Sequence, residues 1–315
     1  MHAVSILQAV LHELDAGRKV ALGVIVATKG STPQPAGVMV CVDEAARMTG
    51  TLGGGCIEAD VRRKAHQLLA EGRCEIVDFT LDGDFGYDDG MICGGRIDVA
   101  ICALGSEDDR TPYREVVGHL LAGRTATLPV RIKTGDESVM YRIHLEAEPQ
   151  LIIAGAGHIS RVLVRIMVPL GFGVHVIDDR AEYANAERFP PPVHCHVGDI
   201  AAALSDFDVG ERTYVVIVTR GHRHDEAALE AILGEPARYI GMIGSRRKIG
   251  VVFDGLRHRG ATEERIARVH APIGLEIGAV TTEEIAVSIA AQLVSVRREV
   301  HANVVEGPIP VPSEP

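Results

Sequence analysis

The stretch "LIIAGAGHIS" (residues 151–160) decides the fold of the C-terminal half, because it joins an apolar run, a glycine turn and the start of a helix. Gly155 and Gly157 allow a tight turn in which the backbone can approach a phosphate, and the amino end of the following helix stabilises negative charge there. His158, at that helix start, is a further candidate ligand contact. A second apolar run ends at Asp178, where dinucleotide-binding folds place the acidic residue that binds a ribose hydroxyl. Ser160 stands where the usual motif has its third glycine.

Further apolar runs and helical patterns alternate along the same half of the chain. Such alternation predicts βαβ units and a Rossmann-like, doubly wound parallel sheet over residues 150–302. The predicted strands cover residues 151–153, 174–177, 214–218 and 239–243, and the predicted helices include residues 159–167 and 226–233. The polar segment 146–150 contains a proline, so we place a domain boundary between residues 149 and 150.

The N-terminal half, residues 1–149, has the pattern of a mixed α/β domain. Its first residues carry apolar side chains at helical spacing. Later patterns predict strands at 20–28, 37–42 and 97–104, helices at 57–69 and 113–121, and a hairpin through 133–138. At the other end of the chain, four prolines in the last eight residues predict a disordered tail over residues 303–315.

Composition excludes several classes of protein. The 315 residues have a net charge of −11, and the longest basic run is Arg246–Lys248, which argues against nucleic-acid binding. We find no apolar run of membrane-spanning length and no signal peptide, so we expect a cytoplasmic protein without a membrane contact. The six cysteines include no CxxC pair, which argues against a structural zinc site.

Two cysteines stand beside glycines. Cys56 follows Gly53, Gly54 and Gly55 at the start of a predicted helix, where the helix dipole favours a thiolate and glycine amides can approach an anion. Cys93 precedes Gly94 and Gly95 after an acidic loop. Two such thiols could form a soft-ligand or sulfur-handling site. The alternative is that they are small buried hydrophobic residues, as we expect for Cys41, Cys102 and Cys195.

With these motifs in view, the chain resembles the XdhC/CoxI family, the xanthine dehydrogenase accessory proteins. The resemblance covers most of the sequence and rests on the order and spacing of several motifs. They are "GSTPQPAG" (30–37), "GGGCIEADV" (53–61), "MICGG" (91–95), "GAGHIS" (155–160), "VIDDR" (176–180), "YIGMIGSRRK" (239–248) and "APIGLEIGAVTTEEIAVSIAAQLV" (271–294).

The resemblance implies an XdhC-type N-terminal domain followed by a Rossmann domain, usually in a homodimer. It also implies a chaperone that binds the molybdenum cofactor (molybdopterin), supports its sulfuration and helps to insert it into xanthine dehydrogenase-type enzymes. A cysteine desulfurase and the client enzyme are the implied partners. In that setting Cys56 and Cys93 are candidates for contacting molybdenum or its sulfur ligand.

The chain departs from the family pattern at one loop. Family members often have Thr-His-x-His after the fourth Rossmann strand, whereas here Arg220 replaces the first histidine and His222 remains. A histidine-based metal site at this loop is therefore not expected. Instead we expect His222, His224 and Asp225 to lie in a solvated loop, with Asp225 capping the next helix.

The segment after the fifth predicted Rossmann strand contains Ser245 and Arg246. Ser245 can cap the helix that follows, and Arg246 can attract a phosphate or carboxylate. A solvated helix face explains the arginine equally well.

Three functions remain open from the sequence. The leading hypothesis is the molybdenum-cofactor chaperone, a maturation factor for which we assign no catalytic residues. The rival is an NAD(P)-dependent oxidoreductase that binds its dinucleotide through Gly155, Gly157 and Asp178, although no motif supplies a proton donor. The third is a nucleotide-sensing scaffold, which fits the fold but has no motif of its own.

Overall fold

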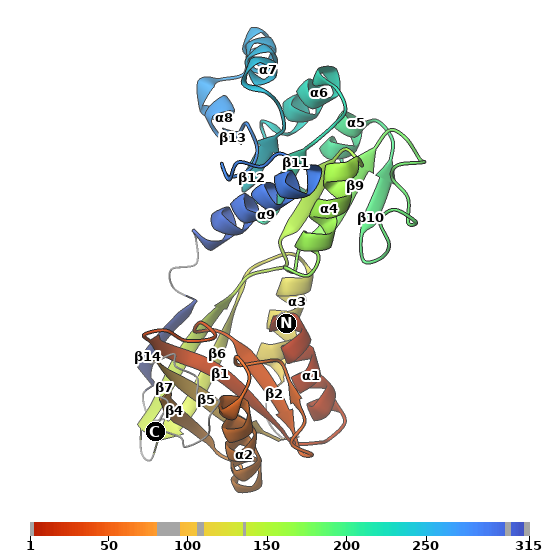
Figure 1. Ribbon diagram of the computed structural model, residues 1–315. Helices are drawn as coiled ribbons and strands as arrows, with labels where there is room; N and C mark the ends of the chain where they lie inside the picture. Colours follow the sequence, from red (N-terminus) through yellow and green to blue (C-terminus); the bar gives the residue numbers. More distant parts are fainter. Residues whose placement is uncertain (1–2, 81–94, 106–109, 135–136, 300–303, 312–315) are drawn as a thin grey trace. The chain divides into compact units, whose positions relative to one another are not determined.

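The computed structural model describes residues 3–80, 95–105, 110–134, 137–299 and 304–311 (Figure 1). The chain divides into two compact units. Unit 1 contains residues up to Ala147 and the C-terminal segment that carries strand β14, and unit 2 runs from Glu148 to His301. Each unit is described by itself.

Unit 1 is built on two antiparallel sheets. The first has the order β3-β2-β1-β5-β4 and the second has the order β14-β7-β6. The strands of the first sheet are β1 (Val20–Lys29), β2 (Met39–Asp43), β3 (Met48–Thr49), β4 (Cys74–Thr80) and β5 (Arg96–Leu104). Those of the second are β6 (Ala126–Thr134), β7 (Glu137–Leu145) and β14 (Val305–Val311).

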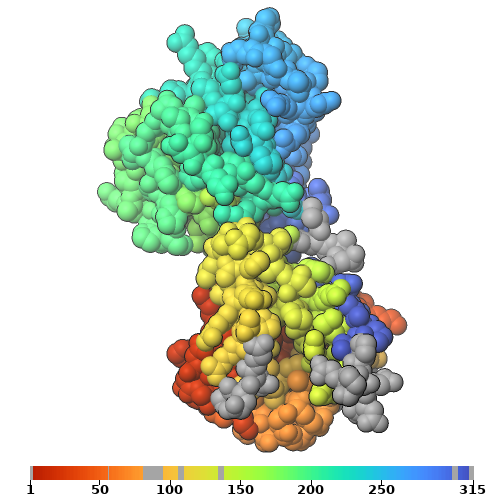
Figure 2. All heavy atoms as spheres, turned by 180° about the vertical axis from the view of Figure 1, so that it is seen from behind, coloured from red at the N-terminus to blue at the C-terminus, as the bar shows by residue number. Residues whose placement is uncertain are grey.

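Three helices complete the hydrophobic cores of unit 1. They are α1 (Ala3–Asp15), α2 (Cys56–Glu71) and α3 (Thr111–Leu121). The buried side chains of α2 form one core with one face of the first sheet. Those of α1, α3 and the second sheet form the other core, and the reverse view shows α3, in yellow, on an outer face of this unit (Figure 2).

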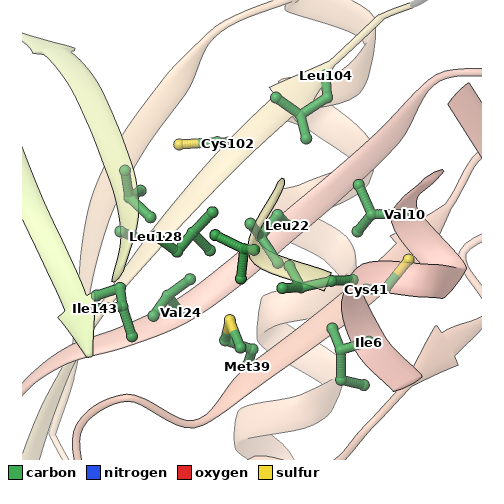
Figure 3. Packing of buried hydrophobic residues seen from close by; sticks show 14 of the residues in the cluster. Ile6, Val10, Leu22, Val24, Met39, Cys41, Cys102, Leu104, Leu128 and Ile143 are labelled. Carbon is green, nitrogen blue, oxygen red and sulfur yellow. The ribbon is translucent and has the colours of Figure 1, made fainter. Parts of the chain in front are cut away.

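Two cysteines are part of the second core. Cys41 and Cys102 lie among apolar side chains such as Leu22 and Leu104 (Figure 3), which confirms the prediction that they are core residues. Burial raises the pKa of the Cys41 thiol to about 12, so this thiol stays protonated at neutral pH. Cys195 is only half-buried, and the prediction that it is a core residue is therefore wrong in degree.

The C-terminal segment is a strand where the sequence analysis predicted disorder. β14 pairs antiparallel with β7, with Val305 opposite Ile143 and Ile309 opposite Met140. Its prolines are tolerated because β14 is at the edge of its sheet, where no second neighbour needs their missing N–H groups. Proline content alone was therefore a misleading signal.

Unit 2 contains a six-stranded parallel sheet with the order β10-β9-β8-β11-β12-β13. The strands are β8 (Gln150–Ala154), β9 (Gly173–Asp178), β10 (His194–Val197), β11 (Thr213–Ile217), β12 (Tyr239–Met242) and β13 (Val269–His270). Every pairing is parallel, and the chain reverses its direction of travel across the sheet between β8 and β11. Ligands of doubly wound folds bind at the carboxyl ends of the strands at this reversal.

Helices cover both faces of this sheet, which confirms the predicted doubly wound fold. The buried side chains of α4 and α9 form a core on one face, and those of α5, α6 and α7 form a core on the other. The helices are α4 (His158–Met167), α5 (Ile200–Ser205), α6 (His222–Ile232), α7 (Arg246–His258), α8 (Glu263–Ala267) and α9 (Thr282–Arg298). Within the described ranges, every helix is too short or too polar to cross a bilayer.

Candidate functional site

The glycine run before Cys56 is required by the backbone conformation of the loop. Gly53, Gly54 and Gly55 all have positive φ, at 113°, 85° and 66°. L-residues rarely adopt this region, so three glycines in a row are needed to make the turn. At Gly53 there is also no space, because a Cβ atom would lie 2.4 Å from the Cβ of Pro33.

Glu58 binds the loop amides that the sequence analysis assigned to an anionic ligand. Its Oε1 accepts hydrogen bonds from the Thr51 hydroxyl at 2.6 Å, the Leu52 N–H at 3.1 Å and the Gly54 N–H at 3.0 Å. The bond from Thr51, followed by those from the two amides, lowers the pKa of Glu58 although burial opposes the shift. The Gly54 amide is therefore already engaged, and the loop presents the first turn of α2 instead.

The loop at residues 30–37 lies against both Cys–Gly motifs. Pro33 packs on Gly53, as described above, and Ser31 packs on Gly95. A Cβ atom at Gly95 would lie 2.1 Å from the carbonyl oxygen of Ser31, so only glycine fits there. Three segments distant in sequence thus meet within unit 1, and the sequence analysis did not predict this contact.

The thiols themselves are not described. Cys93 and Gly94 lie outside the described residues, and for Cys56 the structure gives the backbone position at the start of α2 but not the side chain. Their role as molybdenum contacts stays a prediction. Among the residues that are described, no three histidine, cysteine or acidic side chains come together as a metal-ion site.

The glycine turn of unit 2 lies at the carboxyl end of β8, beside the reversal point. Gly155 has a φ of 108°, and a Cβ atom there would lie 2.6 Å from the Val218 carbonyl oxygen. Gly157 is the N-cap of α4, and its missing side chain faces open space. Ser160 is buried and donates a hydrogen bond to the Gly155 carbonyl at 2.5 Å, so this serine closes the turn in place of a third glycine.

Asp178 is the last residue of β9, as predicted, but its carboxylate is bound to the protein itself. It is 2% exposed and accepts a hydrogen bond from the Ala156 N–H at 2.8 Å. The Arg180 side chain donates to it through Nε at 2.8 Å and Nη2 at 3.0 Å. Burial alone would raise the pKa of Asp178, but these hydrogen bonds lower it on balance. A ribose hydroxyl would have to compete with all of them.

Two arginines surround the same turn. The Arg180 guanidinium lies 3.6 Å from the centre of the Tyr183 ring, and Arg188 lies 4.8 Å from it. Arg188 also donates to the Ala156 carbonyl at 3.3 Å. The sequence analysis missed Tyr183 and Arg188, because a tyrosine and an arginine outside the motif gave no signal.

The loop after β11 differs from its prediction. Asp225 lies inside α6, is fully buried, and accepts a hydrogen bond from Thr219 at 2.6 Å and an ion pair from Lys248. The prediction that Asp225 is a solvated helix cap is therefore wrong, because the first turn of α6 begins at His222. Arg220 instead extends to Asp179, with 2.9 Å between Nη2 and Oδ2.

The predicted cap of α7 is confirmed. Ser245 is the N-cap residue, and its hydroxyl accepts from the Lys248 N–H at 3.3 Å. Arg246 and the exposed His158 follow strand ends at the same carboxyl edge of the sheet. Both are available to a ligand there, and neither is shown to bind one.

Two family models match the chain. The model of the XdhC and CoxI family matches residues 13–80, and that of the XdhC Rossmann domain matches residues 151–293. Together they cover about two thirds of the chain.

Three proteins illustrate the similarity. Uncharacterized protein YqeB of Escherichia coli is 30% identical over 88% of this chain, which spans only 43% of YqeB. The molybdenum cofactor insertion chaperone PaoD of the same species is 24% identical over 93% of this chain and 88% of its own length. A crystal structure from Bacillus halodurans, described as a xanthine dehydrogenase, has the same fold, with a TM-score of 0.81 and 24% identity over 96% of this chain and 97% of its own.

A protein of Bacillus subtilis, described as a probable component of xanthine dehydrogenase, is also similar. It is 24% identical over 91% of this chain and 96% of its own length.

Proposed function

Because the chain belongs to the XdhC and CoxI family, we propose that it binds the molybdenum cofactor and supports its insertion into xanthine dehydrogenase-type enzymes. The similarity to PaoD and to the B. subtilis relative supports this proposal. The cofactor is cargo rather than a resident group, so the chain acts as a maturation factor.

The contact of three glycine-containing segments in unit 1 carries the proposal. The loop at 30–37 packs on Gly53 of one Cys–Gly motif and on Gly95 of the other. Cys56 and Cys93 are each within three residues of these contacts in the sequence. Thiolates are soft ligands, and soft metal or sulfur centres prefer them. Unit 1 therefore supplies the thiols for the metal end of the cofactor.

The turn of unit 2 is proposed to bind a phosphate-bearing group. Gly157 leaves open space at the amino end of α4, where an anion is stabilised by unpaired N–H groups and the helix dipole. His158, Ser245 and Arg246 are the proposed side chains around it. Molybdopterin and nucleotides both carry phosphate, so this turn by itself does not choose between them.

Further parts of the proposal rest on the family. We propose that the chain acts as a homodimer in the cytoplasm. We also propose that it supports sulfuration of the cofactor together with a cysteine desulfurase. The client enzyme is the second proposed partner.

Retention of released cofactor tests the proposed function. Purified protein is mixed with molybdenum cofactor released from a molybdoenzyme, passed through a desalting column and analysed for bound pterin. We expect the wild type to retain pterin, and Cys56→Ala and Cys93→Ala to lose most of it. Cys195→Ala is the matched control, because that thiol is half-buried in unit 2. A wild type that emerges free of pterin would refute the proposal.

The engagement of Asp178 argues against the oxidoreductase. A carboxylate that already accepts bonds from Ala156 and Arg180 offers a ribose diol little. Titration with NADH, followed by fluorescence transfer or thermal shift, is the direct comparison. Strong NADH binding with turnover of a carbonyl or hydroxy substrate would support the enzyme instead.

A further inference from the structure

Unit 2 exposes a group of large apolar side chains around the start of α9. Leu275 is 42% exposed, Ile277 53%, Val280 83% and Val287 49%. These four side chains, here called the apolar patch, lie within one short stretch of sequence. Clustered exposure of this kind is typical of an interaction surface, whereas single exposed apolar residues are ordinary.

The segment before α9 is held in one conformation by hydrogen bonds. The Gly274 N–H donates to Gln292 Oε1 at 2.7 Å, and the Leu275 N–H donates to the Ser288 carbonyl at 3.2 Å. Ser288 returns a bond from its hydroxyl to the Leu275 carbonyl at 2.5 Å. Gly274, with a φ of 98°, leaves no room for a side chain, because a Cβ atom would lie 2.3 Å from the Ser288 hydroxyl.

The end of the segment is fixed in the same way. Glu284 Oε2 accepts from the Val280 N–H at 2.7 Å and from the Thr281 N–H at 2.9 Å, completing a capping box with Thr281. The apolar side chains are thus displayed on an ordered backbone. A surface ordered before binding loses less conformational entropy on association.

The charge around the apolar patch has one sign in its own segment. Residues 271–296 contain Glu276, Glu283 and Glu284, and no lysine or arginine. A second copy that met this surface with its own patch would bring the same glutamates together, which is unfavourable. A partner with basic side chains around an apolar surface would complement it.

The segment also begins at the edge of the sheet that carries the glycine turn. β13 runs parallel to β12, and the Ile273 N–H bonds to the carbonyl of Met242 at 3.1 Å, at the carboxyl end of β12. Gly155 and Gly157 follow β8 at the same edge. A protein bound to the apolar patch would therefore dock beside the proposed phosphate site.

From these observations we infer that the apolar patch is the docking surface for a protein partner whose apolar contact surface is ringed by lysine and arginine. Resting on the proposed function, this partner is the enzyme that receives the cofactor.

Binding to the cofactor-free enzyme tests the inference. The full-length chain is titrated onto the immobilised cofactor-free xanthine dehydrogenase-type enzyme of the same organism. We expect Ile277→Ser/Val280→Ser to bind at least about tenfold more weakly, as is typical when central apolar contacts are removed. The control Val251→Ser, at a residue 57% exposed on α7, should bind as the wild type does. Glu276→Gln/Glu283→Gln should weaken binding and reduce its salt dependence, without altering the apolar side chains.

Two further measurements separate the possible outcomes. Sedimentation gives the oligomeric state, and the desalting assay gives cofactor retention, which Ile277→Ser/Val280→Ser should leave unchanged. Equal enzyme binding by this variant and the wild type would overturn the inference. So would a change from a larger to a smaller self-assembly in the variant, since a second copy would then be the occupant. Loss of pterin by the wild type would instead refute the proposed function and leave the docking result readable.

Discussion

Replacement of Asp178 by asparagine tests whether this carboxylate belongs to the fold or to a ligand site. In the structure the side chain is 2% exposed and accepts from the Ala156 N–H and from Arg180. Asparagine has nearly the same shape, but it removes the charge opposite Arg180. Its amide group can also accept through only one atom, so an N–H donor would face another donor.

The expected loss of stability is large for a single isosteric change. Removing one partner of a buried ion pair costs about 3–5 kcal/mol. Because the Arg180 side chain is 22% exposed, water can solvate the arginine left behind, and we expect about 2–3 kcal/mol. For a unit of this size, about 2–4 °C in Tm accompany each kcal/mol, so the transition of unit 2 should fall by roughly 4–12 °C.

The neighbouring Asp179 is the matched control. Its carboxylate is 33% exposed and pairs with Arg220, which is 51% exposed, so Asp179→Asn should cost at most about 1 kcal/mol. Scanning calorimetry of the full chain measures both variants, and hydrogen exchange at residues 154–160 reports opening of the turn. If the two variants melted alike, the carboxylate of Asp178 would not hold the turn and our interpretation would be wrong.

The pH dependence of the same pair has a definite sign. Because the pKa of Asp178 is lowered in the folded state, the folded protein binds fewer protons there than the unfolded chain. The stability difference between wild type and Asp178→Asn should be complete above the ordinary carboxyl pKa. It should shrink as the pH falls through the lowered value.

Three further predictions concern other parts of the chain. Glu58→Ala should speed hydrogen exchange at the Leu52 and Gly54 amides at least about tenfold, because it removes their shared acceptor; unchanged exchange would contradict the role of Glu58. Gly95→Ala should destabilise unit 1 by about 1–3 kcal/mol, whereas Gly118→Ala, with nothing within 4 Å of the added Cβ, should stabilise α3 in chemical denaturation. Burial and the charges of the neighbouring histidines lower the pKa of His175 to about 4, so the unfolded chain binds the extra proton. Stability should therefore decline from about pH 6.5 to about pH 4 and level off below; His175→Asn should flatten that slope.

The parallel sheet of unit 2 could be predicted because its strands are buried on both faces. Segments such as 151–153 and 214–218 are continuous apolar runs, and the helices between them have a clear period. The edge strand β10 lacked that signal. Its sequence, HCHV, is short and half-exposed, so neither length nor hydrophobicity marked it.

Unit 1 was less predictable because its pairings are non-local. β14 joins β7 from the far end of the chain, and no local pattern records that partner. The contacts of Gly53 with Pro33 and of Gly95 with Ser31 are invisible for the same reason. The motifs themselves marked these positions as unusual, but their spacing could not show that one loop touches both.

The candidate sites follow a common rule that the sequence pattern misled us about. Glycine motifs suggested open amides waiting for an anion, yet in each unit a carboxylate of the chain occupies some of them. Glu58 binds the Leu52 and Gly54 amides, and Asp178 binds the Ala156 amide. An external anion cannot share these donors without displacing a carboxylate whose pKa is already lowered by them. The glycines therefore build rigid turns, and selectivity for a ligand has to come from the groups these turns present: the thiol at the start of α2 and the open amino end of α4.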